Sequence, residues 1–316
     1  MSSFAREYRV VSKRRATKVV RLVVCFWLAL GCAAWPAECA GSDNATVRDG
    51  AGRDVRMPAH PTRIVSLAPS VTEMLFALGA DDRVVGVTDF CDYPAEAARK
   101  ARIGGLINPD LERIVSLSPD LAMATTTGNY LDDAERIERL GIPVYTINAP
   151  TLEAMLETLR TVGGLLGTRS QADALAHSLK RRIDQVRDRA QRRPRARTLY
   201  VIEPEPLVAP GRGTFIGEAL AVAGADLTTV GARTSWAQYD LEQVIGMKPD
   251  LILVPEPNAA WAAGLSAHAE WMKVPAVAAG RVRVISDSIQ HPGPRLVDGI
   301  EEVEKIVERL AASGKP

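Results

Sequence analysis

Histidines are the residues of this 316-residue chain best suited to metal chemistry, and the sequence holds four of them: His60, His177, His268 and His291. A zinc or manganese site needs three or four nitrogen, sulfur or oxygen ligands that converge on the ion. His60 precedes the first predicted strand and His177 falls within a long predicted helix, so convergence is not expected. His291 lies in a loop that can face a cleft, where it could ligate a metal centre or form a hydrogen bond, and we favour the hydrogen bond. We therefore predict no metal site and no resident cofactor.

Motifs that would support catalysis are missing from the sequence. It contains no Gly-x-Ser-x-Gly elbow, no Walker loop and no paired zinc cysteines. Gly211 and Gly213 are not followed by the third glycine of a dinucleotide-binding fingerprint. Cys91 is a lone thiol, a type that is more often inert than reactive. The sequence therefore predicts a protein that is not an enzyme. The rival class, an exported α/β enzyme, would need a convergent nucleophile–base or carboxylate pair, and none is evident.

Two glutamates recur within a repeated segment. Residues 111–123 resemble residues 241–253, since both contain Leu-Glu, then two β-branched residues, then Pro-Asp-Leu before an apolar run. Each copy predicts a short helix, a turn and a buried strand, and the repeat predicts two similar lobes. Glu112 and Glu242 open the equivalent helices. They either interact with the helix N-terminal dipole or present two equivalent carboxylates to a two-fold symmetric partner, and we favour the second interpretation.

The elements that would position these residues follow an α/β rhythm. A hairpin over 46–57, with Asp49-Gly50 as its turn, precedes alternating short apolar strands and helices. Such alternation is typical of a mostly parallel sheet. The predicted strands lie at 63–67, 84–87, 121–124, 144–147, 198–202, 251–254 and 282–285, and the predicted helices at 71–78, 111–117, 132–140, 215–223 and 297–310.

Residues 170–191 interrupt this rhythm. Ala172, Leu179, Ile183 and Val186 recur at helical spacing, and the opposite face is basic, as expected of a solvated helix surface. A helix of this length spans about 33 Å, enough to cross a domain. The predicted fold class is therefore α/β, with two Rossmann-like lobes, each with a central mostly parallel sheet, joined by one long rigid α-helix. The predicted boundaries are 46–167 for the N-terminal lobe, 168–194 for the backbone helix and 195–316 for the C-terminal lobe. A cleft between two such lobes is where a ligand is expected.

The first forty residues have the layout of a secretory signal peptide. Basic residues from Arg6 to Arg21 precede an apolar run at 22–30, and small residues follow as far as Ala40. The run is shorter than the roughly 20 residues of a membrane span, so an uncleaved anchor helix is the less favoured alternative. Cleavage near Ala40 and lipid attachment at Cys32 both remain open. The prediction is export to the periplasm, with a lipid-anchored form as the variant.

The chain that remains after residues 1–40 carries somewhat more acidic than basic groups. It therefore has no nucleic-acid footprint. Of the four cysteines, only Cys91 lies clear of the leader, so no disulfide framework is expected despite the oxidising destination.

Five phrases, in order, resemble the substrate-binding proteins of ABC importers with a helical backbone between their lobes, the group that captures cobalamin, haem and iron–siderophores. The likeness covers roughly residues 46–312 and is strongest to the cobalamin-binding members. The phrases are Arg63-Ile64-Val65-Ser66-Leu67-Ala68-Pro69-Ser70-Val71-Thr72-Glu73, Asp92-Tyr93-Pro94, Leu111-Glu112-Arg113-Ile114, Ser118-Pro119-Asp120-Leu121 and Gly211-Arg212-Gly213-Thr214-Phe215-Ile216-Gly217.

The resemblance implies roles for particular positions. Glu112 and Glu242 match the pair that docks into arginine pockets on the two permease subunits. Phe90 stands where the family places a ligand-facing tyrosine, and Trp236 matches an aromatic wall of the cleft. The loop that touches the ligand corresponds to Asp287, Ser288, Ile289, Gln290 and His291.

Two positions depart from the family pattern. Leu106 and Thr125 occupy places where the family has tryptophans, so a flat macrocycle would be held by less stacking. Arg212, near a predicted helix start, could meet an anionic ligand group or remain a solvated loop residue. The resemblance thus implies a monomeric, exported component of an ABC importer. It would capture a corrinoid, or alternatively haem or an iron–siderophore, and deliver it to a permease dimer, with no nucleic acid as partner.

Overall fold

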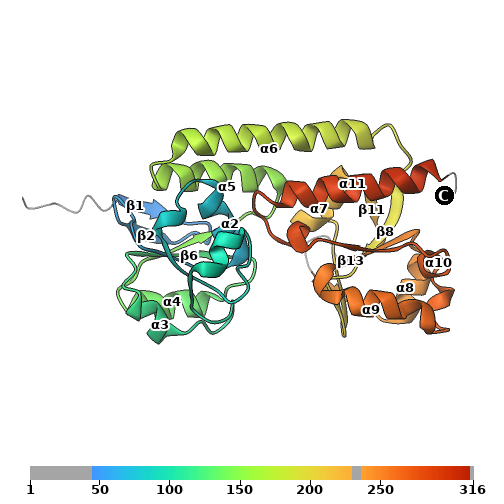
Figure 1. The fold of residues 1–316 in the computed structure, drawn as a ribbon, viewed down its shortest axis with the longest axis horizontal. Helices are drawn as coiled ribbons and strands as arrows, with labels where there is room; N and C mark the ends of the chain where they lie inside the picture. The colour runs from blue at the N-terminus through green and yellow to red at the C-terminus, as the bar shows by residue number, and fades with distance from the viewer. Residues whose placement is uncertain (1–44, 230–235, 314–316) are drawn as a thin grey trace, which may run out of the picture. The chain divides into compact units, whose positions relative to one another are not determined.

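The computed structural model describes residues 45–229 and 236–313, which contain two parallel sheets flanked by helices (Figure 1). The predicted signal peptide and Cys32 lie outside the described residues. Residues 43–316 form one unit. Within the described part of the chain, no helix combines the length and the apolar character that crossing a membrane requires.

The first sheet has five parallel strands in the order β5-β4-β3-β6-β7. Its central strands are buried on both faces, as helices on both sides of a parallel sheet require. The strands are β3 Ile64–Ser66, β4 Val84–Val87, β5 Ala101–Arg102, β6 Leu121–Thr125 and β7 Val144–Ile147. The helices around them are α2 Pro69–Ala77, α3 Leu111–Ser116, α4 Leu131–Arg139 and α5 Leu152–Leu165.

The second sheet has four parallel strands in the order β11-β8-β13-β14. These are β8 Ala196–Tyr200, β11 Ala225–Leu227, β13 Leu251–Pro255 and β14 Val282–Ile285. A small antiparallel sheet, which was not predicted, comprises β9 Glu203–Pro204, β10 Leu207–Pro210 and β12 Trp236–Gln238. The helices are α7 Phe215–Val222, α8 Leu241–Met247, α9 Ala259–Gly264, α10 Pro275–Ala278 and α11 Leu296–Ala312. Short 3₁₀ turns lie at Asp81–Arg83, Ala95–Arg99, Glu256–Asn258, Leu265–Ala267, Trp271–Lys273 and Asp287–Gln290.

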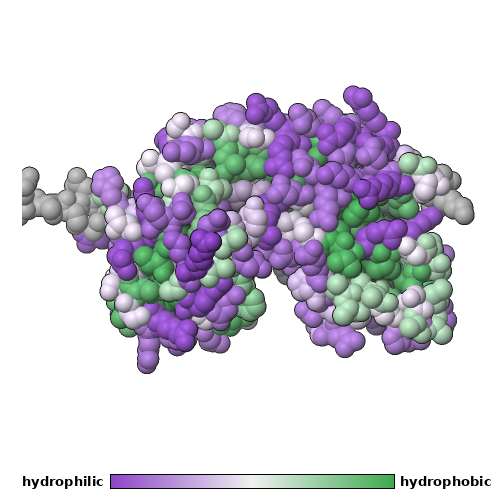
Figure 2. Space-filling model, viewed as in Figure 1, coloured by the Kyte–Doolittle hydropathy of each residue, from purple (hydrophilic) through white to green (hydrophobic). Residues whose placement is uncertain are grey.

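The long helix is confirmed: α6 Arg169–Ala190 is continuous and runs beside α5 and α11 (Figure 1). Its apolar positions Ala172, Ala176, Leu179, Ile183 and Val186 are all buried in a core cluster shared with α5, α7 and α11. The predicted fold class is therefore confirmed. Figure 2 shows the surface hollowed between the half that carries α3 and α4 and the half that carries α8 and α9.

The N-terminal hairpin is also present, as β1 Ala45–Arg48 paired antiparallel with β2 Asp54–Met57. Its turn is longer than the predicted two-residue Asp49-Gly50 connection. The Asp49 carboxylate accepts hydrogen bonds from the backbone N–H groups of Ala51 and Arg53 and so closes a loop over 49–53. An aspartate that bonds its own following backbone favours this wider turn.

The two copies of the repeat fold alike. Asp110 and Asp240 cap α3 and α8 by accepting a bond from the third residue of each helix. After each helix one residue adopts the left-handed conformation, Ser118 and Lys248, both with φ near 47°.

An arginine clamps each turn: Arg63 Nη2 donates to the Leu117 carbonyl and Arg197 Nη2 to the Met247 carbonyl, both at 2.6 Å. The repeated sequence therefore encodes a repeated structure down to its caps and turns.

Candidate functional site

The first group of predicted site residues meets at the carboxyl edge of the five-stranded sheet. Phe90 follows β4 and Thr125 ends β6, so parallel strands bring both to one edge, where open α/β sheets bind ligands. Asn129 ties the loops together, because its side-chain nitrogen donates to the carbonyls of Leu67 and Leu106 and its oxygen accepts from the Thr125 N–H. Phe90 is 58% exposed on this edge.

Thr125 differs from the expectation that its side chain contacts a ligand. It is 1% exposed, and its hydroxyl accepts a hydrogen bond from the Thr127 N–H. The same holds for Ser288, whose hydroxyl lies 2.7 Å from that of Ser286, and for Ile289, which is fully buried in the core. Packing has turned these three side chains inward, so they can position a ligand-binding loop but can contact a ligand only through backbone atoms.

The second group lies in the C-terminal half, around the start of α7. Trp236 is 44% exposed and packs edge-on against Phe215, with ring centroids 6.3 Å apart. It pairs with Pro210 in the small sheet, two residues before Arg212. The exposed Arg212 donates from Nε and Nη2 to the Leu227 carbonyl at 3.1 and 2.9 Å. That anchor fixes the guanidinium at the Leu227 carbonyl.

The predicted ligand loop takes part in a junction between the two halves. The side chain of Glu73, from α2, is only 2% exposed, and its Oε1 lies 2.9 Å from His291 Nδ1 and 3.1 Å from Arg295 Nη2. Arg295 also pairs with Asp287 at 3.1 Å and lies over the Tyr93 ring, 4.5 Å from its centroid. His291 thus forms a hydrogen bond with a protein carboxylate, and its expected contact with a ligand stays a prediction.

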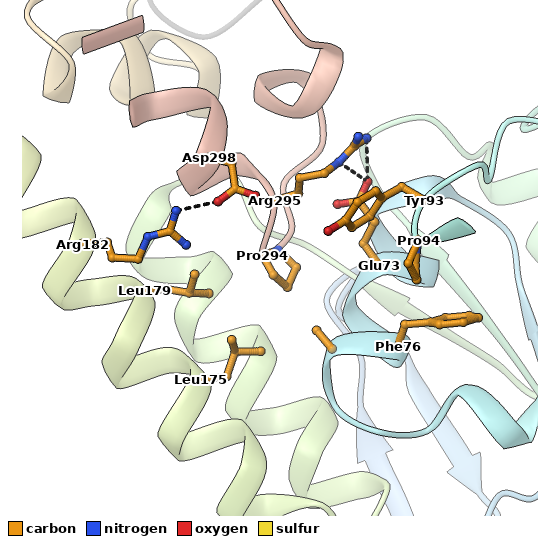
Figure 3. A pocket seen from close by; sticks show the side chains of 11 residues that line it. Glu73, Phe76, Tyr93, Pro94, Leu175, Leu179, Arg182, Pro294, Arg295 and Asp298 are labelled. Atoms are coloured by element: carbon orange, nitrogen blue, oxygen red, sulfur yellow. Dashed lines mark hydrogen bonds and ion pairs between the residues drawn. The ribbon is translucent and has the colours of Figure 1, made fainter. Parts of the chain in front are cut away.

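This junction borders a cavity of about 340 Å³ (Figure 3). Figure 3 shows Arg295 and Glu73 meeting above Pro294, with Leu175 and Leu179 of α6 on one side and Phe76 and Pro94 on the other.

Four residues that matter here were not singled out from the sequence: Glu73, Tyr93, Arg295 and Tyr130. Glu73 carried no signal in the sequence, because it lies on the opposite face of its helix from the apolar stripe Val71, Met74, Leu75 and Leu78, where a charged residue is ordinary. Tyr130 follows Asn129 and is 59% exposed, so a second aromatic stands at the edge that carries Phe90.

The predicted docking glutamates occupy matched positions. Glu112 and Glu242 are each the second residue of their helix, directly after the leucine that follows the aspartate cap. Both are exposed, and neither forms an ion pair with any residue that the structure describes. The two carboxylates are therefore presented in the same local geometry, free for an external partner.

Comparison with known families decides the class of the protein. The model of the family described as "Periplasmic binding protein" matches residues 64–288, which spans both sheets and α6. The chain belongs to this family.

Two relatives of this periplasmic binding protein are a transporter component and a vitamin B12-binding protein. The chain is 30% identical over 270 residues to an uncharacterized ABC transporter substrate-binding lipoprotein of Bacillus subtilis strain 168, covering 83% of this chain and 85% of the relative. It is 26% identical over 247 residues to a vitamin B12-binding protein of Vibrio cholerae, covering 78% and 89%.

Solved structures match as well. A periplasmic heme binding protein of Pseudomonas aeruginosa superimposes with a TM-score of 0.73 at 26% identity, covering 79% of this chain and 94% of that chain. The protein is therefore an ABC transporter substrate-binding component of the group that includes B12, heme and iron binders, and it is a non-enzymatic transport component, as predicted.

Other chemistry within the described residues is limited. No group of three or more His, Cys, Asp or Glu side chains there is arranged to hold a metal ion. Cys91 is fully buried beside the hydroxyls of Thr72 and Thr88, and burial raises the pKa of its thiol, which disfavours the reactive thiolate.

Proposed function

We propose that this binding protein is exported to the periplasm, captures a corrinoid between its two lobes and delivers it to a permease dimer. In this proposal residues 1–40 are removed as a signal peptide or retained in part with a lipid on Cys32, and the mature protein acts as a monomer. The lobes are residues 46–167 and 195–316, with 168–194 as the backbone between them.

The observation that carries the ligand class is one exposed aromatic side chain on each half, Phe90 and Trp236. Aromatic side chains offer large apolar area at little entropic cost, which suits a broad macrocycle. Tyr130 adds a second exposed ring on the same half as Phe90, and Arg212 offers a fixed cation for an anionic side group. The vitamin B12-binding relatives support the same ligand class.

Haem is the alternative ligand, and one observation favours it. Tyr130 is 59% exposed, and a tyrosine phenolate is one of the side chains that can ligate haem iron. An iron–siderophore is a further alternative within the same transporter class, with no residue here that singles it out.

The ligand test is titration of the purified mature protein with cyanocobalamin, haemin and a ferric siderophore, followed by absorption spectroscopy. We expect cyanocobalamin to bind and Trp236→Ala to weaken it by roughly 10- to 100-fold, because a central aromatic contact is worth about 1–3 kcal/mol. Leu140→Ala is the control, expected within about 2-fold because Leu140 is 49% exposed and lies between α4 and β7, at the amino edge of the sheet away from Phe90. Haemin binding without cyanocobalamin binding would replace the corrinoid by the alternative.

The docking test separates delivery from capture. Glu112→Ala and Glu242→Ala should each reduce uptake by reconstituted permease about 30-fold or more, since truncating one partner of a buried interfacial charge pair costs about 2–5 kcal/mol. Ligand affinity should stay unchanged. Glu153→Ala, an exposed glutamate near the start of α5, is the matched control. Normal uptake by the double variant would exclude these glutamates as the docking pair.

A further inference from the structure

The cavity of about 340 Å³ at the junction is separate from the predicted ligand cleft. Its walls come from α2, from α6 and from the chain just before and within α11, so both halves and the connecting helix contribute (Figure 3). Neither Phe90 nor Trp236 lines it. Any molecule held there would occupy a second site.

Glu73 supplies the polar feature of this cavity. Its Oε1 is shared by His291 and Arg295, whereas its Oε2 is buried and has no hydrogen-bond partner among the residues that the structure describes. Gly293 lies against that oxygen, since a Cβ added there would be 3.7 Å from it and only 3.3 Å from the Ser70 carbonyl oxygen. Buried acceptors in native proteins are nearly always paired, so this oxygen lacks a donor. Because the oxygen is buried, a side chain of the lining, such as the 46% exposed Tyr93, must move before a ligand reaches it.

Charged side chains lie around the cavity. Two guanidinium groups, Arg182 and Arg295, are surrounded by the four carboxylates that pair with them: Glu73, Asp287, Asp298 and Glu301. Of these carboxylates only Glu73 and Asp298 line the cavity itself, and His291 also lies 2.9 Å from Glu73, so the unpaired oxygen rather than a net charge is what favours a cation. An ammonium group can donate to Glu73 Oε2, and charge-assisted bonds of this kind are stronger than neutral ones.

The rest of the wall is apolar. Phe76 lies on the α2 side, and Leu175 and Leu179 lie on the α6 side. Such a wall suits an aliphatic or aromatic body attached to the ammonium group. We propose that this cavity binds a small primary amine with an apolar body, with its ammonium group at Glu73 and its body against α6.

The test uses calorimetric titration of the mature protein with phenethylamine and with phenethyl alcohol, its neutral counterpart. We expect the amine to bind about 10-fold or more tightly than the alcohol, because only the amine forms a charge-assisted bond. Glu73→Gln should reduce amine affinity about 10-fold or more. Glu304→Gln is the matched control, since Glu304 is also nearly buried beside two arginines but does not line the cavity, and amine affinity should stay within about 2-fold.

A second pair of variants keeps the test informative if Glu73→Gln loosens the junction. Leu175→Trp should fill the cavity from α6 and abolish amine binding, whereas Leu310→Trp on α11, away from the cavity, should not. Equal binding of amine and alcohol, or unchanged binding by Glu73→Gln, would overturn the proposal. Loss of amine binding in Trp236→Ala would also overturn it, because the amine would then occupy the cleft; corrinoid binding itself does not enter the result.

Discussion

The two halves of α6 are held to their neighbouring helices by different interactions. The first half packs on α5 through small apolar residues, so closely that a Cβ added at Gly163 would lie 2.3 Å from the Ala172 Cβ. The second half is tied to α11 by ion pairs, Arg182 with Glu301 at 2.8 Å and Arg189 with Glu304 at 2.7 Å. The first attachment therefore depends mainly on close packing, whereas the second adds ion pairs to the apolar packing of Ile183 and Val186.

This difference implies different sensitivities. The stability of close packing does not depend on pH and depends only weakly on salt. Partly exposed ion pairs, in contrast, weaken when the salt concentration rises and when acid protonates their carboxylates. The N-terminal attachment should therefore persist under conditions that loosen the C-terminal one. A rigid link between the two lobes needs both attachments of α6. Four predictions, three on substitutions and one on pH, test this comparison.

The largest effect is expected at Gly163. Gly163→Ala places a methyl group into the Ala172 side chain and should lower the free energy of unfolding by about 3 kcal/mol, as overpacking does. Gly164→Ala, the next residue of the same helix, has open space around it and should raise stability by about 0.5–1 kcal/mol. Urea denaturation at low and at high salt measures the unfolding free energy of each variant. Equal effects at the two glycines would show that the close packing is not what joins α5 to α6.

The charged attachment should respond to Glu304→Gln. The Glu304 side chain is 4% exposed and pairs with Arg189 and Arg193, so its loss should cost about 2 kcal/mol, less than a fully buried pair because the arginines reach solvent. Glu308→Gln, at a half-exposed carboxylate paired with the same Arg193, should cost under about 0.5 kcal/mol. Thermal unfolding of the two variants shows whether the burial of the carboxylate, rather than pairing alone, sets how much an ion pair contributes to stability.

Acid should act on the same attachment. Hydrogen bonds from Arg182 and Arg189 hold the pKa values of Glu301 and Glu304 below the ordinary value of 4.5. A carboxyl with a lowered folded-state pKa contributes stability that is complete above the unfolded value and is lost as pH falls through the folded value. Unfolding free energy should therefore fall as the pH drops below 4.5, with a shallower slope in Glu304→Gln. Identical slopes would remove Glu304 from the acid response.

The smallest effect concerns the repeat, where the halves are alike. Ser118 and Lys248 both hold φ near 47°, which disfavours residues with a Cβ. Ser118→Gly and Lys248→Gly should each raise stability by about 0.5–1 kcal/mol in denaturant titrations. Gly246→Ala, in a helix with open space, is a reference for ordinary glycine replacement. A gain at one turn only would mean that the two copies, alike in geometry, differ in energy.

Local patterns were sufficient for most elements of the fold. The alternation of apolar runs and the uninterrupted pattern of residues 170–191 predicted the sheets and α6, because periodic burial is encoded residue by residue. The repeated Pro-Asp-Leu segments predicted the two similar halves for the same reason. The helix α5 was not predicted, and its glycine pair explains part of this: glycine lowers helix propensity, yet Gly163 is needed for contact with α6.

The site depended more on distant contacts. The sequence identified Phe90, Trp236 and the loop 287–291 as candidate ligand contacts. Which of these side chains are exposed and which are buried is decided by packing in the folded protein. The ion pair of Glu73 with Arg295 joins residues more than two hundred positions apart, which no local period can encode. The sequence by itself thus determined most of the strands and helices and which carboxylates are repeated, but not α5 or the small antiparallel sheet. Tertiary structure alone decided which side chains face solvent and which opposite charges meet, because those outcomes depend on long-range packing rather than on neighbouring residues.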